Sequence, residues 1–259
     1  MGSLGSAVAE RRIRSSAPLP GYERLDGLVP VFHPSRMEDR AGKTRDLLDT
    51  GAETFSEILD VGTPDLSVLL VADEDRAAAP REGQRPYPPG LPYLTRATDP
   101  PALVLPETLS GVFEPRTLAT WPLVVWHELA HAFLLQKPVP RTPAWMREFV
   151  PQTLAAAVAR RNGILARHLE AVETSPALEI REFGRPADAK QQMVFQNALL
   201  GLGSAALEEF GEDFLKRLVH ALWTQTEVVG EGRAERLLAD ALGADGKRWL
   251  EGRLELQGG

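Results

Sequence analysis

The most constraining feature of the sequence is the segment VVWHELAHAF at residues 124–133, where two histidines stand four positions apart in an apolar run. On an α-helix, residues four apart lie on the same face about one turn from each other, so the rings of His127 and His131 can converge on one ion. Glu128 is offset by roughly 100° from His127 and can point at a water on that ion without ligating it. The segment therefore predicts a metal-binding helix, and the alternative is a core helix with two incidental histidines.

Composition limits which metal site this can be. The chain has no cysteine, so any metal must be held by imidazole and carboxylate groups. A di-iron bundle would need a second Glu-x-x-His pair. The positions three before His168 and His220 hold Leu165 and Arg217, so these histidines supply no such pair.

A three-histidine metalloprotease is excluded by spacing as well. That class needs Gly and His at the seventh and tenth positions after the first histidine, where this chain has Leu134 and Lys137. The third ligand is therefore expected to be a downstream carboxylate. The segment TPAWMREFV at residues 142–150 supplies one in Glu148.

The local sequence predicts how Glu148 returns to the histidines. Thr142 is a suitable N-cap and Pro143 a suitable first helical residue, so a new helix should start after the proline-rich turn, with Glu148 early in it. A helical hairpin would then bring this carboxylate back toward the first helix. Glu170 and Glu173 are weaker substitutes, since they lie about six turns further along.

The HELAH motif, followed by Pro-x-Trp-x-x-Glu, resembles the gluzincins, the zinc peptidases similar to thermolysin and the aminopeptidases. The resemblance implies one Zn²⁺ per chain, with His127, His131 and Glu148 as ligands and Trp145 packed beneath the site. It also implies a zincin-like fold of the compact minigluzincin type. In such proteins an N-terminal helix and a small sheet lie above the zinc helix, and a helical half lies below it.

The resemblance further implies zinc-dependent hydrolysis of peptide bonds through a metal-activated water, with Glu128 as the catalytic general base. Many relatives use a Tyr or His to bind the oxyanion, but no Tyr follows Tyr93 in this chain. His220 is the candidate oxyanion donor, and the alternative is an ordinary helix histidine. The missing tyrosine motivates a second hypothesis, a zinc-binding gluzincin-fold protein with little or no proteolytic activity that acts as a binding or regulatory module.

Hydrophobic periodicity predicts strands first and helices afterwards, which favours the α+β class. We expect a small N-terminal mixed sheet with a helix packed on the zinc-binding helix, and a mostly α-helical C-terminal half. Strands are expected within 28–34, 65–73, 92–98 and 101–107. Helices are expected over about 38–59, 116–136, 143–172, 188–210, 213–225, 232–242 and 245–255.

Three regions follow from this order. Residues 1–30 are predicted to be a flexible N-terminal arm, residues 31–137 an α+β subdomain that ends in the HELAH helix, and residues 138–259 a helical subdomain that carries the third ligand. The proline-rich segment 74–92 is predicted to be a long surface loop. Pro151 should kink or restart its helix.

Charge and hydropathy exclude two classes of partner. The net charge of −7 provides no basic surface for nucleic acid. The sequence has no uninterrupted run of about 18 apolar residues, so no membrane span is expected. The N-terminus lacks the apolar stretch of an export signal. The expectation is a cytoplasmic protein whose partner is a peptide or protein substrate.

Overall fold

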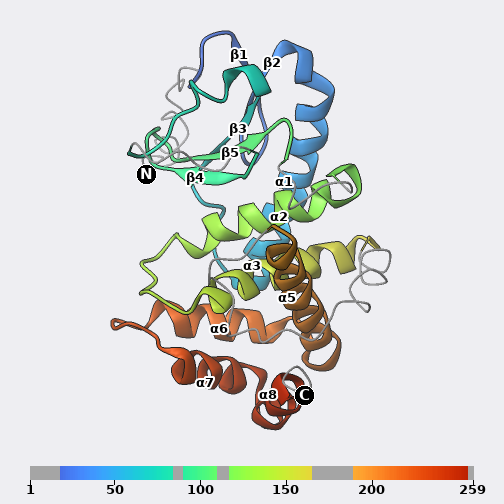
Figure 1. Cartoon of the computed structure of the whole chain (residues 1–259), viewed down its shortest axis with the longest axis vertical. Coiled ribbons are helices and arrows are strands. Elements are labelled where there is room, and N and C mark those ends of the chain that lie inside the picture. Colours follow the sequence, from blue (N-terminus) through green and yellow to red (C-terminus); the bar gives the residue numbers. More distant parts are fainter. Residues whose placement is uncertain (1–17, 84–89, 110–116, 165–188, 256–259) are drawn as a thin grey trace, which may run out of the picture.

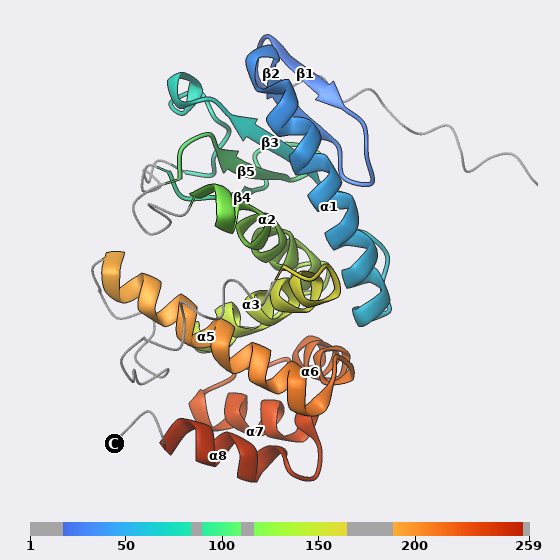
Figure 2. The ribbon, with the colours of Figure 1, turned by 90° about the vertical axis from the view of Figure 1, so that its right-hand side faces the viewer.

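The computed structural model describes residues 18–83, 90–109, 117–164 and 189–255. Within these ranges the architecture is α+β, as predicted, with a small mixed sheet and a larger helical part (Figure 1). The strands are β1 (Tyr22–Leu25), β2 (Val31–Pro34), β3 (Ser67–Val71), β4 (Tyr93–Thr95) and β5 (Ala102–Pro106). The helices are α1 (Glu38–Leu59), α2 (Thr117–Leu134), α3 (Ala144–Arg161), α5 (Ala189–Phe210), α6 (Asp213–Trp223), α7 (Glu231–Leu242) and α8 (Gly246–Glu255). Figure 2 shows the sheet at one end, α6 to α8 at the other, and α2, α3 and α5 between them.

The sheet has the strand order β1-β2-β3-β5-β4. Strands β2, β3 and β5 run parallel, whereas β1 and β4 pair antiparallel to their neighbours. The central strands β3 and β5 are buried at every position, as expected for parallel strands covered on both faces. Alternate side chains join two separate clusters: Val68 and Leu70 belong to the main core with α1 and α2, while Leu69 and Val71 lie in the cluster on the opposite face.

The structure differs from the sequence prediction at residues 18–30. They were expected to belong to a flexible arm, but they contain β1, which pairs with β2. The hydroxyl of Tyr22 donates to Asp75 at 3.0 Å and accepts the backbone N–H of Ala72 at 3.1 Å. The pairing and the burial of Leu19 and Tyr22 in the second cluster hold this segment on the sheet. Residues 1–17 lie outside the described part of the chain.

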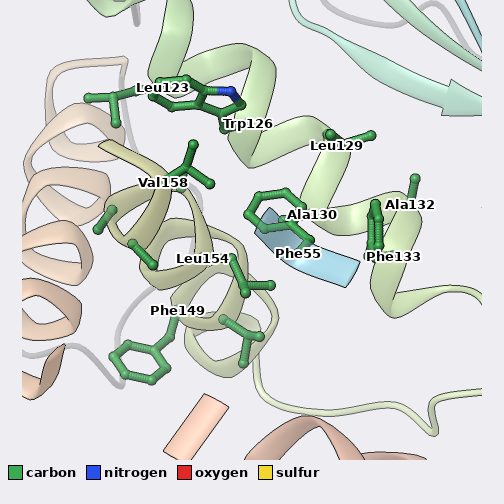
Figure 3. Close-up of a cluster of buried hydrophobic side chains, with 14 of the residues drawn as sticks. Phe55, Leu123, Trp126, Leu129, Ala130, Ala132, Phe133, Phe149, Leu154 and Val158 are labelled. Atoms are coloured by element: carbon green, nitrogen blue, oxygen red, sulfur yellow. The ribbon is translucent and has the colours of Figure 1, made fainter. Parts of the chain in front are cut away.

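Helix α1 has the predicted bounds and holds α2 against the sheet. Phe55, buried on α1, meets Phe133 of α2 edge to face with ring centroids 5.4 Å apart (Figure 3). The indole N–H of Trp126 donates to the carbonyl of Leu47 at 2.7 Å. Gly51 makes this approach possible, because a Cβ there would lie 2.7 Å from the Trp126 ring. These contacts fix the rotation of α2 about its axis.

The remaining helices confirm the predicted order with shifted ends. Helix α3 stops at Arg161, and Gly163 follows with a positive φ of 67°, so the helix predicted to reach residue 172 ends earlier. Residues 165–172 of that prediction lie outside the described ranges. Within the predicted loop 74–92, a short 3₁₀ turn spans Asp73–Asp75, and residues 84–89 are not described.

A charge cluster joins the 3₁₀ turn Ser35–Met37, just before α1, to the ends of β3 and β5. Both guanidinium nitrogens Nη1 and Nη2 of Arg36 donate to the Glu107 carboxylate at 2.6 Å, and the backbone N–H of Asp73 donates to it at 3.1 Å. The hydrogen bonds from Arg36, aided by that backbone donor, lower the pKa of Glu107 from 4.5 to about 2 despite opposing desolvation. The carboxylate is therefore more stable in its charged form in the folded protein than in the unfolded chain.

We expect Glu107→Gln to lower the free energy of unfolding at pH 7 by about 1 kcal/mol, after discounting the pKa shift for solvent screening. A depressed pKa stabilises the fold above pH 4.5, and this contribution is lost as the pH falls toward 2. The wild-type stability should therefore decline more steeply than that of Glu107→Gln over this window in urea titrations. Glu53→Gln, an exposed carboxylate on α1, is the control. Parallel pH profiles for wild type and Glu107→Gln would contradict the assignment.

Candidate metal centre

Helix α2 brings its two histidines together as the spacing predicts. Trp126, Leu129 and Phe133 are almost fully buried in the core that α2 shares with α1, as the side chains in Figure 3 show. With the helix fixed in this way, Nε2 of His127 lies 3.1 Å from Nε2 of His131. The two ring nitrogens thus point at a common position.

The predicted third ligand comes from α3. Oε2 of Glu148 lies 3.2 Å from Nε2 of His127 and 3.7 Å from Nε2 of His131. These three residues form the group of possible metal ligands found among the described residues. The side chains are mostly sheltered, with exposed fractions of 11% for His127, 28% for His131 and 24% for Glu148.

The start of α3 differs in detail from the prediction. The helix begins at Ala144, so Pro143 occupies the N-cap position in place of Thr142, and no side-chain cap bond forms there. The helix also continues through Pro151 to Arg161 without the predicted restart. Glu148 still lies early in the helix, as the local sequence indicates, since the first residues after the turn set its position.

The three distances fit a small divalent ion. Metal bonds of about 2.0–2.2 Å in a tetrahedral arrangement place the ligand atoms roughly 3.3–3.5 Å from one another. The separations of 3.1, 3.2 and 3.7 Å bracket that range. Two imidazoles and one carboxylate are also a donor set that zinc uses in catalytic sites, where a fourth position is left for water.

The charge balance of the cluster also favours a cation. Burial tends to raise the pKa of Glu148, but the hydrogen bonds to His127 and His131 outweigh it and hold the pKa far below its ordinary value. Burial tends to lower the pKa of His131, yet the hydrogen bond to Glu148 and the charge of Glu128 raise it. The anionic carboxylate attracts a cation, and the raised pKa of His131 means that a metal ion must displace a proton from this imidazole in order to bind.

Glu128 lies next to this group in sequence and is partly exposed. Its charge acts on His131, which places its carboxylate near the centre. Among the described residues it makes no hydrogen bond or ion pair, and it is not one of the three convergent ligands. Glu128 is therefore a further carboxylate close to the centre and is not one of its three ligands.

The outer nitrogen of His127 departs from the usual pattern of metal-binding histidines. Such residues normally donate their second ring N–H to a carboxylate or carbonyl. Nδ1 of His127 is buried, and no partner lies within hydrogen-bonding reach in the described part of the chain. In the described part of the chain, the hydrogen bond that orients a ligand is made to Glu148, not to His127.

His220, the candidate oxyanion donor, contacts the end of α1 and a neighbour on its own helix. Its Nε2 lies 3.0 Å from the carbonyl oxygen of Leu59, and its ring packs on Trp223 with centroids 5.2 Å apart. These contacts join α6 to the end of α1. They favour the alternative of an ordinary helix histidine over an oxyanion donor.

Trp145 is buried, and it contacts residues of α3 and α7. Its indole N–H donates to Glu231 at 2.6 Å, and its ring meets Phe149 edge to face. It thus ties the start of α3 to α7. The weaker carboxylate candidates Glu170 and Glu173 lie outside the described residues.

One functional contact was missed from the sequence. The side-chain amide of Gln196 on α5 donates from Nε2 to Oε2 of Glu148 at 3.2 Å. Gln196 stands far from both ligand segments in the chain, and a lone glutamine in a helix carries no recognisable spacing. The contact becomes visible only once α5 is packed on α3.

Comparison of the chain with models of known protein families, with curated proteins and with solved structures gives no match. In the ranges that the structure describes, no helix is both long and apolar enough to cross a membrane. The functional assignment therefore depends on the geometry and chemistry of the centre.

Proposed function

We propose that the chain is a zinc metallopeptidase with a zincin-like fold, in which His127, His131 and Glu148 hold one zinc ion. The observation that carries the proposal is the convergence of three ligand atoms within 3.1 to 3.7 Å of one another from two packed helices. The small sheet and α1 on one side of α2, with the helical half on the other, support the zincin-like part of the proposal.

The chemistry follows from the donor set. A zinc ion held by these three ligands would acidify a water, whose pKa can fall from about 15.7 toward 7 at such a site. Glu128 would accept a proton from the water that adds to the peptide carbonyl carbon. The same carboxyl group would then donate this proton to the leaving amine as the C–N bond breaks. Proton transfer by a placed side chain of this kind accelerates reactions by roughly 10² to 10⁴.

An extended peptide is the substrate class we propose. Among the described strands, β4 is the last of the sheet and pairs with β5 on one side. It also contacts α2, which carries the two histidines. An edge strand beside a hydrolytic centre can pair with an extended peptide through main-chain hydrogen bonds. Just beyond the strand, the backbone N–H of Arg96 donates to Glu82 at 2.6 Å, so this N–H group is already hydrogen-bonded and does not extend the edge.

The second candidate is a zinc-binding protein of the same fold without efficient proteolysis, acting as a binding or regulatory module. The contacts of His220 with Leu59 and Trp223 favour it, because they occupy the residue expected to bind the oxyanion.

Peptide-library cleavage with zinc-loaded protein separates the two functions. Turnover that is abolished by chelator and restored by zinc supports the peptidase. Tight peptide binding without turnover supports the binding module. Equal turnover before and after complete removal of zinc would overturn the peptidase proposal.

A further inference from the structure

The carboxylate of Glu148 is held by a chain of two glutamines. Gln196 donates from Nε2 to Oε2 of Glu148 at 3.2 Å. Gln152, one turn after Glu148 on α3, donates from its own Nε2 to Oε1 of Gln196. Oε2 of Glu148 is the same atom that faces both histidines. The glutamine chain therefore acts on the ligand atom itself.

Chemistry fixes the orientation of both amides. An ionised carboxylate can only accept hydrogen bonds, so Gln196 must turn its NH₂ group toward Glu148. Its carbonyl oxygen then faces Gln152, which must donate. The two amides therefore have a single satisfied arrangement, in which Gln152 sets the orientation of Gln196 and Gln196 sets that of Glu148.

Close packing of α5 on α3 places Gln196. A Cβ added to Gly203 would overlap Oγ1 of Thr153, so only glycine lets the two helices approach this closely. Gly203 follows Gln196 by seven residues, about two turns, and therefore lies on the same face of α5. Leu199 between them is fully buried. The face that packs on α3 thus also delivers the amide to Glu148.

We infer that Gln196 is a positioning residue for the proposed metal centre, oriented by Gln152, and that it sets the affinity for zinc by holding Glu148 in its ligating position. The inference rests on the proposed function, since it presupposes a metal bound by Glu148. Groups that orient metal ligands typically change the affinity by about 10-fold to 100-fold when they are removed.

The test is the zinc dissociation constant of Gln196→Met, measured by competition with a chelator of known affinity. Methionine keeps the length of the side chain and removes the donor. We expect binding to weaken by about 10-fold to 100-fold. The matched control is Gln136→Met. Gln136 lies just after the end of α2, and the variant loses the hydrogen bond from its side-chain amide to the carbonyl of Gly62. It should retain the wild-type affinity.

Gln152→Met and the double variant separate positioning from a general structural effect. We expect Gln152→Met to weaken zinc binding by a smaller factor, and the double variant to match Gln196→Met, because both residues act through one hydrogen-bond chain. Thermal melting of the metal-free proteins provides the stability readout. Gln152→Met alone tests the chain if Gln196→Met does not fold, and an unchanged affinity in it would then overturn the inference.

The outcomes distinguish the two levels of the proposal. Wild-type affinity in folded Gln196→Met would overturn the role of Gln196. Additive losses in the double variant would overturn the role of Gln152 in orienting it. Both results would leave the metal centre standing. Failure of the wild-type protein to bind zinc would overturn the metal centre and this inference together.

Discussion

Glu128→Gln is expected to reduce kcat/KM for peptide hydrolysis by about 10²- to 10⁴-fold while zinc binding is retained. The substitution keeps the size and position of the side chain but removes the group that accepts the proton of water. Zinc is retained because Glu128 is not one of the three convergent ligands. The measurement is kcat/KM on a peptide selected from the library, together with the zinc content of each preparation.

The control for this result is Glu53→Gln, an exposed carboxylate on α1 with the same chemical change. It should leave both turnover and zinc content unchanged. Full activity in Glu128→Gln would contradict the proposed mechanism even if the zinc site itself is correct. Loss of zinc in Glu128→Gln would show instead that the carboxylate helps to hold the metal.

His127→Ala is expected to remove zinc binding at ordinary protein concentrations. It deletes one of three protein ligands and leaves Glu148 with a single imidazole partner. The loss of zinc affinity should therefore exceed the roughly 10- to 100-fold that is typical when a group that only orients a ligand is removed. Zinc titration followed by chelator competition measures the effect, and circular dichroism shows whether the fold is retained.

His220→Ala is the matched substitution on another helix. Its ring contacts Leu59 and Trp223 and is not among the convergent ligands, so full zinc binding is expected. Equal affinities in His127→Ala and His220→Ala would contradict the assignment of the ligands.

The histidine pair could be predicted because its geometry is local. Once residues 117–134 form a helix, a spacing of four places His127 and His131 on one face whatever surrounds them. Glu148 required one more step, a helical hairpin, and the proline-rich turn before Ala144 signals it. The error in the N-cap and the continuation of the helix through Pro151 did not alter this result, because neither changes which turn of α3 carries the carboxylate.

Contacts between segments that are distant in the chain could not be predicted from the sequence. Gln196 reaches Glu148 only because Gly203 allows α5 to approach Thr153, a relation that no periodicity reveals. Likewise, the sequence did not indicate that His220 of α6 contacts the carbonyl of Leu59 at the end of α1.

The N-terminal strand was missed for a similar reason. β1 has only four residues, Tyr22–Leu25, and its composition is polar. Pairing with β2 and burial of Tyr22 stabilise it, and both depend on the completed sheet. Elements that depend on their neighbours in this way show little pattern of their own.

The central claim is that His127, His131 and Glu148 bind one zinc ion. Its most direct test is the metal content of protein prepared without chelator, measured by mass spectrometry for the wild type and for Glu148→Ala. We predict about one zinc per chain in the wild type and a sharp reduction in the variant. Absence of bound metal in the wild type, even after zinc is supplied, would contradict the claim and leave the HELAH segment as a helix with two histidines.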